Sequence, residues 1–169
     1  MANDKLGLPS KERIALIRNQ VSNLLWYGKL ETTATRARSV RSKAEKFITL
    51  AINSYEDTVK AVKTIKDDKG VKTDREVLND GPKKLAARRA MMAYLYDLQE
   101  QKHDKESKAS FKARTQEINH PLIEKLFNVY APKYSERAKE LGTKGGYTRI
   151  IKLYQRRGDA AQKVLIELV

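Results

Sequence analysis

A single apolar stripe along residues 33–53 restricts the possible folds of this chain more than any other feature. Apolar side chains recur there at helical spacing, and at about 100° per residue they cover an arc of about 100°. Those apolar positions are Ala37, Val40, Ala44, Phe47, Ile48 and Ala51. Five cations lie outside the arc, at Arg36, Arg38, Arg41, Lys43 and Lys46. The pattern predicts a helix from Thr33 or Thr35 to about Asn53 that buries one side and presents the other to a partner.

The positive charge of the chain is concentrated at its two ends. The 169 residues include 35 Lys or Arg and 21 Asp or Glu, which gives a net charge of +14. Residues 1–50 carry +6, residues 51–117 carry +3 and residues 118–169 carry +5. A polyanion relieves the repulsion within such a surface and releases its own condensed counterions. We therefore expect a nucleic-acid partner bound where the two ends meet; an anionic membrane and acidic proteins are weaker alternatives.

Several classes of protein are excluded or disfavoured. The chain has no cysteine, which excludes disulfides, thiolate metal sites and a cysteine nucleophile. His103 and His120 are separated and lack further ligands at metal-binding spacing. The sequence has no membrane-length apolar run, targeting segment, nucleotide-binding glycine motif or paired general acid and base. We expect a cytoplasmic protein that is not an enzyme and uses no cofactor, metal or small-molecule substrate.

Helical spacing recurs elsewhere in the chain. The pattern predicts a first helix from Ser10 to a stop at Gly28, and another over 55–66 with its two valines inward. A further helix is expected over 85–99, and another opens at Asn119 or His120 with Pro121 in its first turn. The proline at 132 ends or kinks that last helix.

Strand-forming runs lie at the edges of this helical pattern. Residues 29–33 form a short β-prone segment, and the runs 147–154 and 164–169 flank a polar turn, which predicts a C-terminal hairpin. The polar stretch 67–84 is interpreted as a loop or a short accessory element, and the stretch 100–117 as a solvated extension or a disordered loop. The predicted fold class is α+β, with several helices packed on a small mixed sheet that ends in the β-hairpin.

Two clusters are candidate RNA contacts. The first is the set of cations on the helix at 33–53, where the alternative is a solvated face; Glu45 is the only acid between Thr32 and Ser54 to pair with it. The second cluster joins the segment 145–149 to the segment 156–159, where glycines allow close approach, Tyr147 offers a ring for stacking and the arginines add charge. Hairpin formation alone is the alternative there. For the aromatic pair at 26–27, packing is favoured over base stacking.

The order of these segments resembles a known family. The resemblance lies in Lys5-Leu6-Gly7, Arg13–Asn19, Lys29–Arg41, Ala87–Arg89, Leu126-Phe127, Ala131–Tyr134, Glu136-Arg137, Gly145–Ile150, Arg156–Ala160 and Ile166–Val169. In this order they are similar to the bacterial large-subunit ribosomal protein L-seventeen family. The resemblance implies one RNA-binding α+β domain over 1–169, seated on large-subunit ribosomal RNA near the nascent-chain exit. It also implies that one copy of the protein is present per ribosome and that it contacts neighbouring large-subunit proteins.

The resemblance and the clusters together define the candidate RNA-binding residues. They are Lys11, Arg13, Arg18, Arg36, Arg38, Arg41, Lys43, Arg88, Arg89, Tyr147, Thr148, Arg149, Arg156 and Arg157. The chain departs from the family in two ways. Members begin with a more basic arm and have a basic residue before the first helix, where this chain has Leu8-Pro9. This chain also carries extra material within about 54–83 and 100–118, and a few extra residues around Lys139 to Lys144. We expect these extensions to face solvent or a neighbouring protein.

Two alternatives come from other classes of function. A chromosomal protein could place the helix at 33–53 in the major groove of duplex DNA, although the sequence lacks a helix-turn-helix spacing. An RNA-modifying or RNA-cleaving enzyme would need a catalytic acid or histidine, and no residue is nominated for that role. The favoured prediction remains a structural, RNA-binding ribosomal protein.

Overall fold

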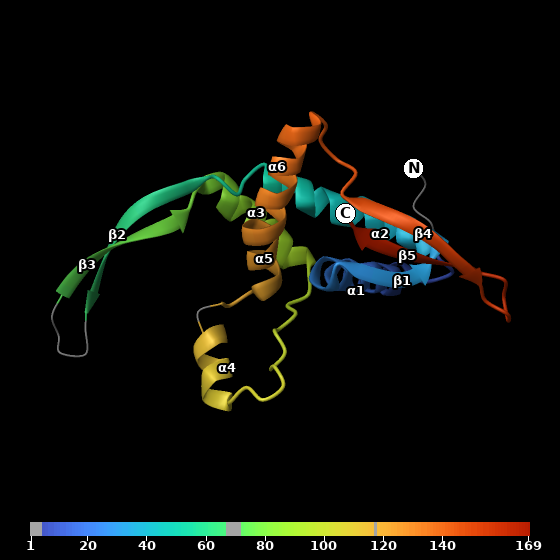
Figure 1. Cartoon of the computed structure of the whole chain (residues 1–169), viewed down its shortest axis with the longest axis horizontal. Coiled ribbons are helices and arrows are strands. Elements are labelled where there is room, and N and C mark those ends of the chain that lie inside the picture. The colour runs from blue at the N-terminus through green and yellow to red at the C-terminus, as the bar shows by residue number, and fades with distance from the viewer. Residues whose placement is uncertain (1–4, 67–71, 117) are drawn as a thin grey trace.

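A computed structural model describes residues 5–66, 72–116 and 118–169 (Figure 1). Its helical elements are α1 (Ser10–Tyr27), α2 (Ala34–Ile52), α3 (Pro82–Tyr94), α4 (Lys108–Thr115), α5 (Pro121–Lys125), the π-helix η1 (Leu126–Tyr130) and α6 (Ala131–Leu141). Its strands are β1 (Lys29–Thr33), β2 (Thr58–Lys66), β3 (Lys72–Asp80), β4 (Thr148–Gln155) and β5 (Gln162–Leu168). Within these ranges, no helix combines the length and the hydropathy needed to cross a membrane.

The main sheet joins the two ends of the chain. Its strand order is β1-β5-β4, and the register places Leu30 opposite Ile166 and Ile166 opposite Ile150. Strands β2 and β3 form a separate antiparallel pair. The predicted α+β class and the C-terminal hairpin are confirmed. The prediction of a mixed sheet is wrong, because every described strand pair is antiparallel; β2–β3 and β4–β5 are consecutive strands, for which a short connection requires this direction, and β1 joins β5 from the other end of the chain.

The core is built where α1 and α2 pack against each other and against the sheet. From α1, Leu24 and Leu25 are completely buried, and from α2, Val40 and Ile48 are completely buried. Ile166 of the central strand β5 is also buried in this core. Each fully buried Val, Leu or Ile side chain contributes about 1.5–3 kcal/mol relative to an exposed one. The apolar stripe predicted from residues 33–53 is therefore the inner face of α2.

The ends of the first two helices agree with the sequence patterns. Helix α1 ends at Tyr27, and Gly28 follows with φ +78°, a left-handed conformation that favours glycine. The backbone N–H of Gly28 donates to the carbonyl of Leu24 at 2.8 Å. Helix α2 begins after Thr33 and ends before Asn53, as predicted.

Pro132 lies inside a continuous helical run instead of ending it. Helix α5, the π-helix η1 and helix α6 follow one another without a break, and Pro132 occupies the first turn of α6. Just before it, the N–H of Ala131 donates to the carbonyl of Leu126, five residues earlier. Proline lacks an N–H and displaces the preceding turn, and the wider π turn absorbs this disturbance.

Two segments extend from the body (Figure 1). The sequence predicts a helix over 55–66 with Val59 and Val62 inward, and this prediction is wrong, because 58–66 is strand β2 and both valines are at least half exposed. The β-branched residues of this run favour an extended backbone over a helix. In the stretch 67–84, where a loop or a short accessory element is predicted, strand β3 occupies 72–80, and residues 67–71 lie outside the described residues. The helix predicted over 85–99 is present at 82–94 and ends five residues earlier than predicted.

The second extending segment, residues 97–118, is partly helical. The sequence predicts a solvated extension or a disordered loop over 100–117, and the structure has an extension that contains α4. The side chain of Ser107 accepts a hydrogen bond from the backbone N–H of Ser110 at 3.0 Å, which caps the helix. None of the α4 side chains is buried, so the helix stays on the surface of the molecule.

A remote carboxylate caps the start of α3. Asp57 accepts hydrogen bonds from the backbone N–H groups of Lys83 at 2.8 Å and Lys84 at 3.3 Å. Its own carbonyl accepts from the N–H of Gly81 at 2.8 Å. A Cβ built on Gly81 would lie 2.4 Å from the Asp57 carboxylate. Glycine is therefore required here to leave room for the cap, and the cap ties the base of β2 to α3.

We expect Gly81→Ala to lower the free energy of unfolding by about 1–2 kcal/mol, because the new methyl group displaces the capping carboxylate. Urea unfolding at neutral pH measures this loss. Gly158→Ala is the matched control, since a Cβ there meets nothing within 4 Å. Equal urea midpoints for the two variants would show that the Asp57 carboxylate can move aside without a loss of stability.

Candidate nucleic-acid interface

The outer face of α2 presents cations, as the sequence predicted. Arg38, Arg41, Lys43 and Lys46 are exposed, and Arg36 is half-buried. The Nε atom of Arg41 lies 3.2 Å from the carboxylate of Glu45, and the ammonium of Lys43 lies 5.8 Å from the ring centre of Tyr94. In the described part of the chain, Arg36, Arg38 and Lys46 form no ion pair.

Three of these cations, Arg38, Arg41 and Lys46, line a groove between α2 and the start of β4. The groove has a volume of about 690 Å³, and we call it the basic groove. The rest of its lining includes Glu45 of α2 and, from the C-terminal end of the chain, Gly145 and Tyr147. The groove therefore lies where the two segments that the sequence singled out meet, but α2 supplies all of its cations, and the arginines of the C-terminal hairpin are not in its lining.

Glu45 is the carboxylate within the basic groove, and it links the two walls. It accepts a hydrogen bond from the hydroxyl of Thr148 at 2.7 Å and pairs with Arg41 at 3.2 Å. Thr148 is buried, so this contact is shielded from solvent. Because Glu45 is engaged in this way, Arg38 and Lys46 give the groove an excess of positive charge. Clefts lined by one sign of charge concentrate ions of the other sign.

The glycines at 145 and 146 shape the second wall. Their φ angles are +102° and +60°, values that side chains with a Cβ rarely adopt. A Cβ at either position would meet open space, so the requirement for glycine is conformational. Arg137, which the sequence analysis did not select, donates from Nη2 to the carbonyl of Gly146 at 3.3 Å and holds this loop against α6.

Tyr147 is placed differently from the sequence interpretation. Its side chain is only 5% exposed, and its ring lies 4.9 Å from that of Tyr134 at an angle of 55°. Burial raises the pKa of Tyr134 to about 12, which fits an apolar surrounding. A ring packed in this way offers no free face to a base, so in this structure Tyr147 supports the groove by packing and not by stacking.

The C-terminal hairpin carries three more candidate arginines. Arg149 pairs with Glu167 on the neighbouring strand at 2.5 Å. Arg156 pairs with Asp159 across the turn, and the hydrogen bonds from Arg156 and from the Ala161 N–H lower the pKa of Asp159. Arg157 is exposed and forms no ion pair with another described residue. The tip of this hairpin projects from the body, away from β2–β3 (Figure 1).

The candidate residues of α1 separate into two kinds. Lys11 is exposed, and Arg13 donates to the Ser10 hydroxyl at 3.3 Å. Arg18 instead donates from Nε to the carbonyl of Tyr94 at 2.6 Å, and its guanidinium lies 4.8 Å from the ring centre of Tyr96. A cation at this position satisfies a free carbonyl at the end of α3. The guanidinium of Arg18 is thus engaged in joining α3 to α1.

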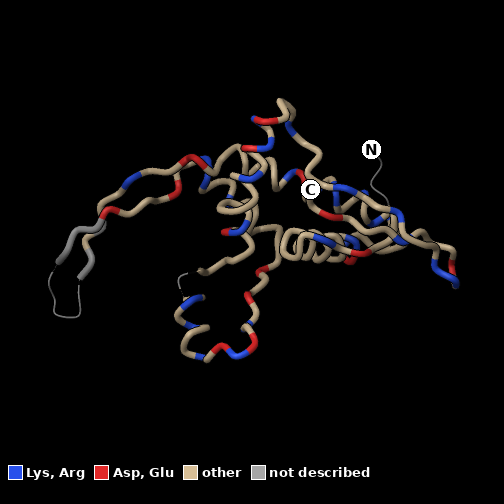
Figure 2. The backbone as a smooth tube through the Cα atoms, viewed as in Figure 1, with Lys and Arg blue, Asp and Glu red and all other residues tan. Residues whose placement is uncertain are grey.

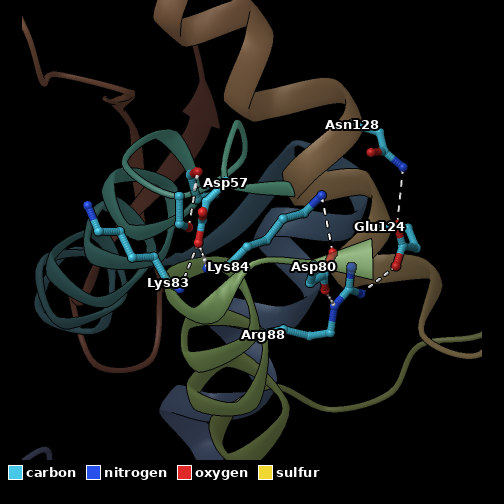
Figure 3. Close-up of polar contacts among 9 residues, drawn as sticks. Asp57, Asp80, Lys83, Lys84, Arg88, Glu124 and Asn128 are labelled. Atoms are coloured by element: carbon cyan, nitrogen blue, oxygen red, sulfur yellow. Dashed lines mark hydrogen bonds and ion pairs between the residues drawn. The ribbon is translucent and has the colours of Figure 1, made fainter. Parts of the chain in front are cut away.

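Arg88 is at the centre of a polar cluster that joins three elements (Figure 3). Its Nε lies 2.5 Å from Asp80 of β3, and its Nη1 contacts Glu124 of α5. Lys84 approaches the same Asp80 at 3.2 Å, and Asn128 donates to Glu124 at 3.2 Å. We call these five residues the Arg88 cluster. It fixes the base of the β2–β3 hairpin against the body.

The electrostatics of Arg88 support a structural role. Burial alone lowers the pKa of the Arg88 guanidinium, but its hydrogen bonds to Asp80 and Glu124 outweigh burial and raise the pKa overall. The guanidinium also lies 5.2 Å from the ring centre of Phe127. Arg89, the next residue, is exposed and has no ion pair within the described residues. Of this pair, Arg89 is the side chain available to an outside partner.

The fold and the basic groove define a basic α+β protein with a groove formed by both ends of the chain and lined by cations of α2. The family model for ribosomal protein L17 matches residues 16–169. Similar curated proteins are named large ribosomal subunit protein bL17. That of Lachnospira eligens is 39% identical, over 98% of this chain and 97% of its own. That of Thermoanaerobacter sp. (strain X514) is 36% identical over the whole of both chains, and that of Clostridium beijerinckii is 38% identical over 98% and 96%. This chain belongs to the ribosomal protein L17 family.

We expect Arg88→Met to lower the free energy of unfolding by about 2 kcal/mol, because two partly buried carboxylates lose their cation. Arg89→Met removes the same charge from an exposed site and should change stability by less than about 0.5 kcal/mol. Urea unfolding of both variants at neutral pH separates the two outcomes. Equal stability would show that the Arg88 cluster contributes nothing to folding.

The same cluster predicts a pH dependence. Burial raises the pKa of Asp80, but hydrogen bonds and charges from Arg88 and Lys84 outweigh burial, so the pKa in the folded state is lowered. A lowered pKa stabilises the fold above the unfolded value of about 4, and this stability is lost as the pH falls through the folded value. The stability gap between the wild type and Arg88→Met should narrow below about pH 4. A gap independent of pH would contradict this assignment.

Proposed function

We propose that this chain is a structural constituent of the bacterial large ribosomal subunit, and that its basic groove holds the phosphate backbone of large-subunit ribosomal RNA. Membership of the ribosomal protein L17 family supports the first part. The observation that carries the second is a groove with three cations of α2 against one carboxylate, and that carboxylate is already engaged by Arg41 and Thr148. Following the family resemblance, we place the protein in the cytoplasm, as one copy per ribosome near the nascent-chain exit.

The chemistry of the groove suits phosphate. Arg38 presents a planar fork that can donate two parallel hydrogen bonds to phosphate oxygens. Lys46 adds a point charge on the same face. Because Gly145 has no side chain, an RNA strand can approach its backbone closely. Arg36, Arg89 and Arg157 lie outside the groove lining and extend the contact surface. Because these groups bind the backbone, the contact positions the RNA more than it selects a sequence.

Binding to duplex DNA has less support from the arrangement of α2. A recognition helix has to protrude far enough to enter the major groove. Helix α2 instead packs against α1, α6, η1, α3 and all three strands of the main sheet. Its cations form one wall of a groove instead of the surface of a projecting helix. This arrangement fits a shaped RNA surface better than the groove of a regular duplex.

We expect the double variant Arg38→Ala, Lys46→Ala to weaken binding to large-subunit ribosomal RNA. It should also reduce the slope of log K against log salt by about 1–2, because each lost phosphate contact removes about 0.7–0.9 from it. Filter binding from about 50 to 200 mM salt measures both effects. Lys108→Ala, Lys112→Ala is the control, since it removes the same charge from α4. If both pairs reduce the slope equally, the groove has no special role.

Sedimentation tests the ribosomal assignment. The full chain should co-sediment with large subunits in a sucrose gradient of cell lysate, and the Arg38→Ala, Lys46→Ala variant should be depleted from them. Absence of the wild-type chain from assembled subunits would refute the proposed function.

A further inference from the structure

The two segments that extend from the body carry no net charge. Residues 54–83, which contain β2 and β3, hold seven Lys or Arg and seven Asp or Glu. Residues 97–118, which contain α4, hold five of each. The rest of the chain therefore carries the whole net charge of +14. Figure 2 shows both signs along the two extending segments. This division separates a basic body from neutral extensions.

A cleft of about 820 Å³ lies between residues 97–118 and the body. We call it the neutral cleft. Its floor includes the end of α1, with Trp26 and Tyr27, and the π-helix η1, with Val129. The opposite wall includes Glu100 and Arg114. π-Helical turns are found frequently at functional sites, because they place side chains where a regular helix would not.

Several charged groups of the neutral cleft are already bound within the protein. Arg114 contacts Glu100 and lies 3.2 Å from Glu106. Lys125 donates to the carbonyl of Trp26 at 2.6 Å, and burial lowers the pKa of its ammonium. Glu124 is held by Arg88. The basic groove has three cations against one carboxylate, whereas the neutral cleft offers a polyanion no such excess.

The neutral cleft also exposes large apolar side chains. Tyr27 is 61% exposed and Val129 is 52% exposed, and both line it. Trp26 is half-buried beside them, with the ammonium of Lys125 5.3 Å from its ring centre. Aromatic side chains with apolar surface and a polar edge are enriched where proteins bind other proteins. Apolar side chains gathered in a cleft are typical of such interaction sites.

We propose that the neutral cleft binds a segment of a second protein, one that is uncharged where it enters and inserts at least one large apolar side chain between Tyr27 and Val129. Charge decides between the classes of partner. A nucleic acid needs cations, and those of this chain lie elsewhere, whereas an uncharged protein segment gains by covering apolar surface. The inference rests on the proposed function, since the partner would be another protein of the large subunit.

Photo-crosslinking in assembled subunits tests this proposal. The full chain with p-benzoylphenylalanine in place of Tyr27 is incorporated into large subunits and irradiated, and the crosslinked peptide is identified by mass spectrometry. The expected result is one segment of one ribosomal protein. Crosslinks mainly to RNA, or no crosslink, would overturn the proposal. If the chain is absent from large subunits, the proposed function fails together with this proposal. If the chain is present but gives no protein crosslink, only the proposal for the neutral cleft fails.

A charge introduced into the neutral cleft separates protein from RNA as its occupant. Val129→Lys should reduce the protein crosslink from position 27 by at least about tenfold, which corresponds to about 1.4 kcal/mol. An RNA occupant would instead be held more tightly by the new cation. Leu141→Lys is the control, because Leu141 is 61% exposed and lies outside both the neutral cleft and the basic groove. An unchanged yield with Val129→Lys, or equal losses in both variants, would overturn the proposal.

If Val129→Lys impairs folding, a photoreactive group in place of Val129 provides the second measurement. Its crosslink to protein is compared between the chain with Tyr27 and the chain with Tyr27→Ala. The crosslink from position 129 should then fall while binding of RNA by the basic groove stays unchanged. Loss of both together would contradict a separate protein-binding site.

Discussion

The burial of one stripe of α2 against α1 and the main sheet is the interaction on which the rest of the molecule depends. Ala37, Ala44 and Ala51 are completely buried along this stripe, and small side chains let the packed elements approach closely. The strands β4 and β5 come from the far end of the chain, so the same contact brings the two basic ends together. The cations gain nothing from this packing themselves. Their common position is a consequence of apolar burial on the opposite side of α2.

The arginines divide into those that the fold engages and those that it leaves for a partner. Arg18 satisfies carbonyls at the end of α3, and Arg88 joins β3, α3 and α5. Both guanidinium groups are partly removed from water, and hydrogen bonds within the chain compensate for this. Arg38 and Arg157 are exposed and have no ion pair among the described residues. A count of arginines in the sequence therefore overstates the number of cations left free for a partner.

The two clefts of the molecule differ in what they can attract. The basic groove combines cations with glycine backbone, while the neutral cleft combines paired charges with exposed Tyr27 and Val129. Glu124 connects the neutral cleft to the Arg88 cluster, and thereby to the base of β2–β3 (Figure 3). The β2–β3 extension is thus anchored to the basic body by partly buried polar contacts, and each kind of surface keeps its own electrostatic character.

Local sequence patterns determined the parts of this protein that depend on near neighbours: the span of α2, the stop at Gly28 and the C-terminal hairpin. Each follows from a spacing of 2 or about 3.6 residues or from one backbone conformation. The sequence predicts a helix at 58–66, because its valines are three residues apart, a helical spacing; the segment is a strand because it pairs with 72–80. Contacts between distant residues decided the site. Thr148 reaches Glu45 across 103 residues and Arg88 reaches Glu124 across 36, and which charges stay free depends on such contacts, which no local pattern encodes.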